Sequence, residues 1–193
     1  MPRTFVSKVI SSGILSLSIL TVWIASALAQ STTRPATSPV ELSQTAKDAQ
    51  YHFSIRYPAG WTRRNDDAPG NINVDSPTTR PEELSADFMA VAYPLSKIPG
   101  KIDSLDAYHK HEMQLVQQYQ GQVIDERDAQ LAGLPAKRSA FTTKYNGGEQ
   151  FVITVGAIKD GTVFGISFTG TAADAQRYSE EIEAMIQSFR LEP

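Results

Sequence analysis

Three histidines are the strongest potential metal ligands in this 193-residue chain, because it contains no cysteine. His109 and His111 lie two residues apart in a segment that predicts a helix, so their side chains point about 200° apart and do not chelate one ion together. We expect His109 to pack partly buried and His111 to be exposed. His52 lies on the polar side of a predicted strand and has no partner nearby in the sequence. The sequence therefore predicts no metal site at the histidines.

The segment 71–82 has asparagine, aspartate and glutamate at the spacing of a calcium-binding loop. It begins with Asn71 instead of aspartate, carries Ser76 where the loop needs glycine, and is interrupted by two prolines. The alternation of Ile72 and Val74 is typical of a short strand and explains the same residues. We expect a strand here and no calcium site.

Nucleophilic catalysis finds no support in the sequence, which lacks a Gly-x-Ser-x-Gly motif and any cysteine. The acidic residues Asp125, Glu126 and Asp128 surround an arginine and are expected to be exposed. The glycines of 147–148 and Gly161 follow apolar runs as hairpin glycines and do not open a helix, which a phosphate-binding loop requires. The sequence predicts no catalytic residue and no cofactor, and hence a protein that is not an enzyme.

Aromatic residues offer the one remaining hint of a binding site. Tyr57, Trp61 and Tyr93 can line a recess at one end of the sheet. Packing in the core explains the same residues. The recess and core packing remain alternatives at this point.

The elements that must position these residues are organised around the segment 139–189. It reads as three strands joined by Asn-Gly and Asp-Gly turns, which supply the positive φ of tight hairpins. A helix follows Thr171, with an apolar stripe that must pack on the sheet. The predicted strands are Tyr51–Tyr57, Asn71–Asp75, Asp87–Leu95, Val123–Leu131 at an edge, Ser139–Tyr145, Gln150–Ile158 in mid-sheet, and Thr162–Thr169.

A second helix is predicted over Ser104–Tyr119, begun by Asp103 or Ser104 and ended at Gly121. Its expected apolar stripe consists of Leu105, Tyr108, Leu115, Val116 and Tyr119. Together these elements predict an α+β fold with a largely antiparallel, five- to six-stranded sheet flanked by helices on both faces.

The first 29 residues have the features of a signal peptide: Arg3 and Lys8, a mostly apolar run, and Ala27-Leu28-Ala29 before a new N-terminus at Gln30. An uncleaved membrane anchor is the alternative. Residues 30–48 read as a disordered linker rich in serine, threonine and proline, and residues 49–193 as the folded domain. We expect an exported, soluble protein, periplasmic or extracellular, with no stable membrane anchor after cleavage.

Cleavage after residue 29 leaves 16 basic and 21 acidic residues and a formal charge of −5. A mildly acidic chain without a basic run is a poor ligand for nucleic acid, because binding depends on attraction to phosphates. We expect no nucleic-acid partner.

Four short segments resemble the PsbP-like family, which includes PsbP of photosystem II and the related DcrB-type exported proteins. They are Phe53–Trp61, Gly133–Ala136, Asp160–Phe164 and Ile186–Phe189, and the resemblance covers 51–191. It implies an antiparallel sheet flanked by helices and an accessory or protein-binding role rather than catalysis. The chain lacks the lipoprotein cysteine of many bacterial relatives.

The sequence therefore leads to a first hypothesis, an exported non-enzymatic accessory domain that binds a protein partner. A module that binds a small apolar molecule or lipid is the alternative, and an unrecognised hydrolase is a weaker one. An exposed apolar patch favours the first, an apolar pocket the second, and convergent titratable groups the third.

Overall fold

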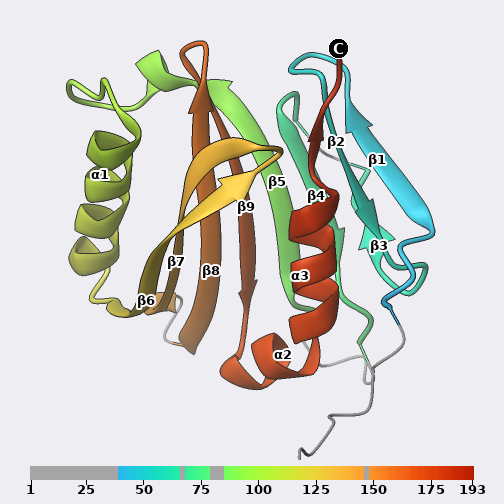
Figure 1. Ribbon diagram of the computed structural model, residues 1–193. Helices are drawn as coiled ribbons and strands as arrows, with labels where there is room; N and C mark the ends of the chain where they lie inside the picture. Colours follow the sequence, from blue (N-terminus) through green and yellow to red (C-terminus); the bar gives the residue numbers. More distant parts are fainter. Residues whose placement is uncertain (1–38, 66–67, 79–84, 146–147) are drawn as a thin grey trace, which may run out of the picture. The chain divides into compact units, whose positions relative to one another are not determined.

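The computed structural model describes residues 39–65, 68–78, 85–145 and 148–193. They form two antiparallel sheets and three α-helices (Figure 1). The predicted signal peptide with Ala27, Ala29 and Gln30 lies outside the described residues, as does the linker as far as residue 38. Among the described residues, no helix has the length and apolar character needed to cross a membrane.

The small sheet contains β1, β2 and β10, and the large sheet has the order β3-β4-β5-β9-β8-β7-β6, with every neighbouring pair antiparallel. The strands are β1 (Gln44–Asp48), β2 (Phe53–Tyr57), β3 (Thr62–Arg63), β4 (Asn71–Asp75), β5 (Asp87–Pro94), β6 (Gln122–Leu131), β7 (Leu134–Tyr145), β8 (Gly148–Lys159), β9 (Thr162–Gly170) and β10 (Arg190–Leu191). The helices are η1 (Leu95–Lys97), α1 (Leu105–Gln118), α2 (Ala172–Arg177) and α3 (Ser179–Ser188).

The predicted α+β fold with an antiparallel sheet is confirmed. The large sheet has seven strands rather than five or six, because it contains six of the predicted strands and the two-residue strand β3 joins them. The remaining predicted strand, Phe53–Tyr57, lies in the separate small sheet. Hairpin turns connect β6 to β7 and β8 to β9. Their central residues Ala132, Gly133, Asp160 and Gly161 all have positive φ, as two-residue hairpin loops require.

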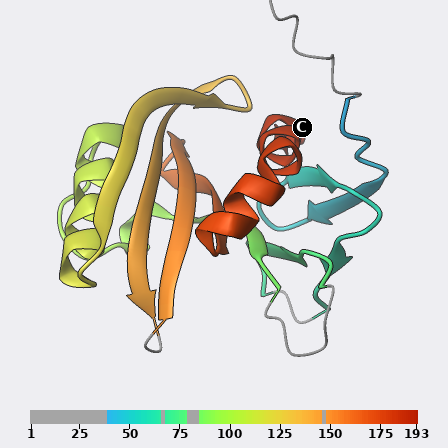
Figure 2. The same ribbon diagram turned by 90° about the horizontal axis from the view of Figure 1, so that it is seen from below.

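The main core lies between the large sheet and the layer of α3 and the small sheet. Figure 2 shows α3 between the two sheets. Phe53 of β2 stacks on Phe189 at the end of α3, with ring centroids 5.4 Å apart, and Phe164 of β9 meets the same ring edge-on. The apolar stripe of the last helix therefore packs as its 3.6-residue period predicts.

The opposite face of the large sheet carries α1, which packs on β6, β7 and β8. A second, smaller apolar cluster of Val116, Phe141 and Val152 holds the helix there. Gly156 of β8 permits a close approach, since a Cβ at this position would lie 2.7 Å from the Tyr108 ring. Helices thus flank the sheet on both faces, as predicted.

Several boundaries differ from the prediction. β7 begins at Leu134 rather than at Ser139. The sequence predicts a 30–48 linker, but Gln44–Asp48 forms β1, which pairs with β2 and buries Ala46. One alanine among polar residues gives no visible alternation, and the strand exists because β2 offers a partner edge. The helix after Thr171 is split at Tyr178 into α2 and α3, and Thr171 closes a capping box with Asp174.

The predicted stripe of α1 is wrong at two positions. Tyr108 and Val116 are buried, but Leu115 and Tyr119 are exposed. The line of residues that faces the sheet runs through Tyr108, Glu112 and Val116 at i, i+4 spacing, so Leu115 and Tyr119 lie to one side of it.

Candidate functional site

The three aromatic residues of the predicted recess are not brought together. Tyr57 and Trp61 are buried in the main core, where the Trp61 ring meets Tyr178 edge-on at 5.3 Å. Tyr93 lies on the other face of the large sheet, and its hydroxyl is 3.4 Å from that of Tyr108. Core packing therefore accounts for Tyr57 and Trp61, while Tyr93 belongs to the interface with α1.

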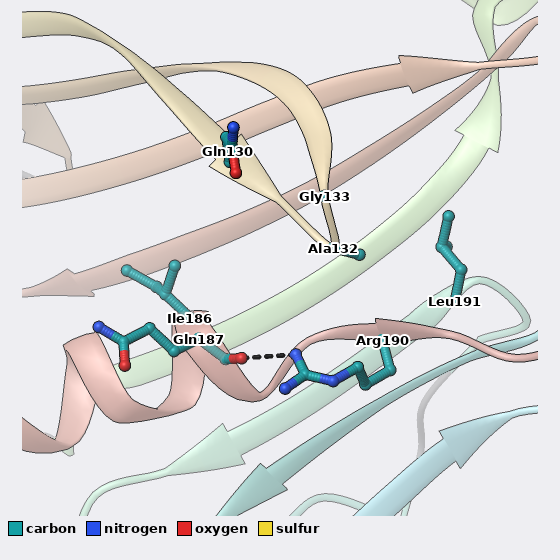
Figure 3. Close-up of a pocket in the computed structure, with 7 residues that line it drawn as sticks. All are labelled: Gln130, Ala132, Gly133, Ile186, Gln187, Arg190 and Leu191. Carbon is teal, nitrogen blue, oxygen red and sulfur yellow. Dashed lines mark hydrogen bonds between the residues drawn. The ribbon is translucent and has the colours of Figure 1, made fainter.

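Two hollows border α3, one beside the β6–β7 hairpin and one beside β8 and α2, and we refer to them together as the groove. Its upper hollow, about 430 Å³, is shown in Figure 3 and is lined by Gln130, Ala132, Gly133, Ile186, Gln187, Arg190 and Leu191. The Arg190 guanidinium donates hydrogen bonds to the carbonyl oxygens of Gln187 at 2.6 Å and Phe189 at 2.8 Å. The cation therefore neutralises the partial negative charge at the C-terminus of α3.

The lower hollow of the groove, about 330 Å³, has mostly apolar walls from β8, α2 and α3, among them Phe151, Ile153 and Ile182. Arg138 of β7 lines it too and makes a bidentate ion pair with Glu183 of α3. The pair ties the helix to the sheet across the groove. Both hollows are large enough for a small molecule. Among the described residues that line the lower hollow, the titratable side chains are Arg138 and Glu183, which pair with each other.

A polar cluster lies under α1. His109 Nε2 is 2.8 Å from a Glu126 oxygen of β6, and His109 Nδ1 is 3.8 Å from a carboxylate oxygen of Glu112. Burial raises the pKa of Glu112, and the nearby His109 and the Thr154 hydroxyl oppose this shift only in part. The predicted partial burial of His109 is confirmed, with 17% of its side chain exposed.

The chemistry of this cluster is limited by access. Ser139 is directly opposite both Glu126 and Thr154 in the sheet, but only 1% of it is exposed and its hydroxyl makes no hydrogen bond with another described group. A buried hydroxyl under a packed helix has no approach for a substrate. Among the described residues, no three histidine, aspartate or glutamate side chains lie close enough together to hold a metal ion.

Only a weak signal for the polar cluster is present in the sequence. Glu112 follows His109 by three residues on one helical face, a spacing that predicts contact between them. Nothing in the sequence indicated that the face would pack over Glu126 and Thr154, which come from two different strands. Burial also raises the pKa of Tyr93 and of Tyr108, so these phenols remain protonated beside the cluster.

An exposed apolar patch lies where α1 ends and β6 begins. Figure 1 shows this junction at one corner of the large sheet. Leu115 is 40% exposed, Tyr119 62%, Val123 40% and Ile124 58%, and these are the exposed large apolar side chains of the described residues. We call these four residues the corner patch. Exposed apolar side chains are ordinarily scattered singly, and a group of them within ten residues marks an interaction surface.

The stretch of sequence that carries the corner patch is rich in uncharged polar residues. The stretch Met113–Ile124 contains five glutamines and no charged residue, in a chain in which 20% of residues are charged. Gln114, Gln117, Gln118, Gln120 and Gln122 are all exposed. This composition resembles the centre of a protein interface, where charged residues are depleted.

Comparison with known proteins gives matches among solved structures alone, since no family model and no curated protein matches the chain. The cyanobacterial PsbP (CyanoP) of Synechocystis sp. PCC 6803 is 11% identical at a TM-score of 0.53, over 77% of this chain and 91% of that one. The Ran-binding protein Mog1p of Saccharomyces cerevisiae is also 11% identical, at a TM-score of 0.53 over 77% and 94% of the two chains.

LpqN of Mycobacterium tuberculosis, described as involved in cell envelope biogenesis, is 15% identical at a TM-score of 0.50, over 73% of this chain and 83% of that one. At such identities the likeness concerns the fold, which proteins of different function share. This chain has the PsbP-like fold.

Proposed function

We propose that the chain is an exported, non-enzymatic accessory domain that binds a protein partner through the corner patch. The observation that carries the proposal is the clustering of Leu115, Tyr119, Val123 and Ile124 on an uncharged surface. Burial of such side chains on binding supplies the main favourable free energy of protein association.

The patch rests on a well-packed base, which favours binding over local disorder. Val116 of the same helix packs beneath it against Phe141 and Val152. The turn at Gly121 is held by a hydrogen bond from its amide to the Val116 carbonyl oxygen at 2.8 Å. A surface that is already ordered loses little conformational entropy when a partner docks.

The fold is compatible with this role. One similar structure, Mog1p, is named as a Ran-binding protein, and this supports protein binding as a use of the same architecture. The polar cluster under α1 gives less support to catalysis, because its Ser139 hydroxyl is buried.

Export is supported by the signal-peptide features of the first 29 residues. The intact mass of the protein purified from its host tests it. We expect a chain that starts at Gln30, recovered outside the cytoplasm. A chain that retains Met1 and sediments with membranes contradicts cleavage and favours an anchor.

Partner binding is tested by placing a photo-crosslinking residue at position 119 in the host, with position 44 as the matched control. Both positions are exposed, and Gln44 lies on β1, outside the patch. We expect one crosslinked product of discrete mass from position 119, none from position 44, and loss of that product with Ile124→Ser. Equal labelling from both positions, or no product at all, contradicts the proposal.

A second candidate function, binding of a small apolar molecule, is favoured by the lower hollow of the groove with its walls of Phe151, Ile153 and Ile182. Native mass spectrometry of the protein from its host tests this candidate. An adduct of defined small mass that disappears with Ala175→Phe, which fills the hollow, supports it. A bare chain in both proteins contradicts it.

A further inference from the structure

The chemistry of the corner patch suits a second copy of the same chain. We propose that two copies associate about a two-fold axis through the surface formed by Met113–Ile124, with Tyr119 and Ile124 at its centre. This inference rests on the proposed function of the patch as a protein-binding surface, and it names the partner.

Net charge favours this surface over others for a contact between two copies. After cleavage at residue 29 each copy carries a formal charge of −5. Two acidic copies repel each other wherever exposed carboxylates meet. The twelve residues of Met113–Ile124 contain no charged side chain, so any like charges in a contact made there come from neighbouring residues such as Asp125.

The polar residues of this surface are self-complementary. A two-fold contact places the same residues on both sides, so each polar group must be able to pair with its own kind. A glutamine amide is both a donor and an acceptor and therefore satisfies this condition, whereas a lysine or a glutamate does not. The exposed polar side chains of the stretch are all glutamines, namely Gln114, Gln117, Gln118, Gln120 and Gln122.

The backbone beneath the surface is fixed, so association requires little rearrangement. A Cβ at Gly121 would lie 2.5 Å from the Thr142 carbonyl oxygen and 2.7 Å from a Val116 methyl carbon. The turn between α1 and β6 therefore sits directly on β7 and on the helix end. Such a turn presents Tyr119 and Val123 in set positions.

The charged residues that follow on β6 limit how far the contact extends. Asp125 pairs with Arg127 at 2.8 Å, Glu126 with His109 at 2.8 Å, and Asp128 with Lys137 at 2.7 Å. These groups are already satisfied within their own copy. A charged edge strand with a bulge between Val123 and Asp125 resists pairing with another strand. The contact is therefore made by side chains of the patch and is not a sheet continued across two copies.

Sedimentation velocity of the mature protein tests the inference. We expect the weight-average mass to rise from that of the monomer toward twice that value over roughly 1–100 µM, because association follows mass action. Because the contact is uncharged, we expect the dissociation constant to change less than about twofold between roughly 0.05 and 0.5 M salt, with a slight tightening as repulsion is screened.

Substitution by lysine distinguishes an effect of the patch on association from an effect of the net charge. Tyr119→Lys and Ile124→Lys are each expected to weaken association at least about tenfold, because each places a charge in the buried centre of the contact. Gln44→Lys makes the same change in net charge on an exposed residue of β1 and is expected to leave association unchanged. All three lower the net negative charge and so reduce repulsion, hence a loss confined to the patch variants is a local effect.

A mass that stays monomeric across the concentration range overturns the inference, as does a dimer that both patch variants leave intact. The crosslinking experiment described above distinguishes this failure from that of the proposed function. A product of twice the chain mass agrees with the dimer. A product of another mass keeps the patch as a binding surface for a different protein, and it excludes the second copy as the partner in the host. Thermal unfolding of each variant confirms that its fold is intact.

Discussion

Glu112 occupies a position where ionisation of its carboxyl group is unfavourable. The side chain is turned toward the sheet beneath α1, and burial raises its pKa above the ordinary value. The protonated form of the carboxyl group is therefore more favoured in the folded protein than in the unfolded chain. The stability linked to this group is fully present below the ordinary glutamate pKa and is lost as pH rises through the raised value.

We predict that Glu112→Gln removes this loss. Glutamine keeps the shape and the hydrogen-bonding groups of the protonated acid but does not ionise. The melting temperature of the variant is expected to match that of the parent at acidic pH and to exceed it increasingly as pH rises from the ordinary glutamate pKa to the raised pKa of Glu112. Above the raised pKa we expect the difference to stay constant. Thermal unfolding followed by circular dichroism between pH 4 and 8 provides the measurement. A difference that is largest at low pH would contradict the assignment.

Gly156 also determines how closely α1 packs on the sheet. A Cβ at this position would lie 2.7 Å from a Tyr108 ring carbon, so Gly156→Ala requires the helix to move outward. We expect a loss of about 1–3 kcal/mol in the free energy of unfolding, which is typical of overpacking. Chemical denaturation gives the value.

Gly60→Ala serves as the control for this substitution. Its Cβ would have one contact, with a Pro77 side-chain carbon at 4.0 Å. A similar loss at both positions would mean that glycine is needed for its backbone freedom, and that the approach of Tyr108 is not the cause.

Single residues on α1 show where sequence reasoning succeeds and where it fails. The partial burial of His109 followed from its place near an apolar stripe. The exposure of Leu115 and Tyr119 did not, because their spacing is compatible with the same stripe. To predict which residues of α1 are buried, one must know that Glu112 faces Thr154 and that His109 contacts Glu126. Both partners lie on strands that are distant from α1 in the sequence.

At the scale of elements, local patterns were more reliable. Alternation of apolar residues located β4, a run of residues that is apolar on both faces located β5, and the Asp-Gly turn located the β8–β9 hairpin. These signals lie within the segment itself. The strand β1 and the division between two sheets depend on which edges are available for pairing, and this is a property of the assembled fold.

Substitution in β1 tests whether this strand belongs to the folded domain. Ala46 is 1% exposed and lies opposite Ile55 of β2, whereas its neighbour Thr45 points outward. We predict that Ala46→Asp lowers the free energy of unfolding by about 2–4 kcal/mol, since it buries a charge in the small sheet. Thr45→Asp is expected to change it by less than about 0.5 kcal/mol. If urea denaturation gave equal values for the two, residues 44–48 would act as the linker that their composition indicates.

At the scale of the whole molecule, β8 connects the two apolar cores. Its residues Ile153, Val155 and Ala157 belong to the main core, and Val152, directly before Ile153, belongs to the cluster under α1. The strand has hydrogen-bonded neighbours on both sides, β7 and β9. Loss of β8 therefore removes support from both faces of the large sheet together, and we expect the domain to unfold in a single transition.

Ala157→Asp tests this coupling. The residue has no exposed surface and lies opposite Ala136 on β7 and Phe164 on β9, so a carboxylate there is surrounded by apolar side chains. The expected loss is at least about 3 kcal/mol, a large part of the 5–15 kcal/mol that stabilises an ordinary domain. Ala173→Asp, on the exposed side of α2, is the matched control and is expected to unfold like the parent.

In a protein that comprises residues 30–193, Trp61 is the single tryptophan, so its fluorescence follows the main core, and circular dichroism follows the whole fold. Coincident midpoints that shift together in Ala157→Asp agree with one cooperative unit. A variant that loses the fluorescence signal while keeping a separate later transition would show instead that the α1 side of the sheet folds without the main core.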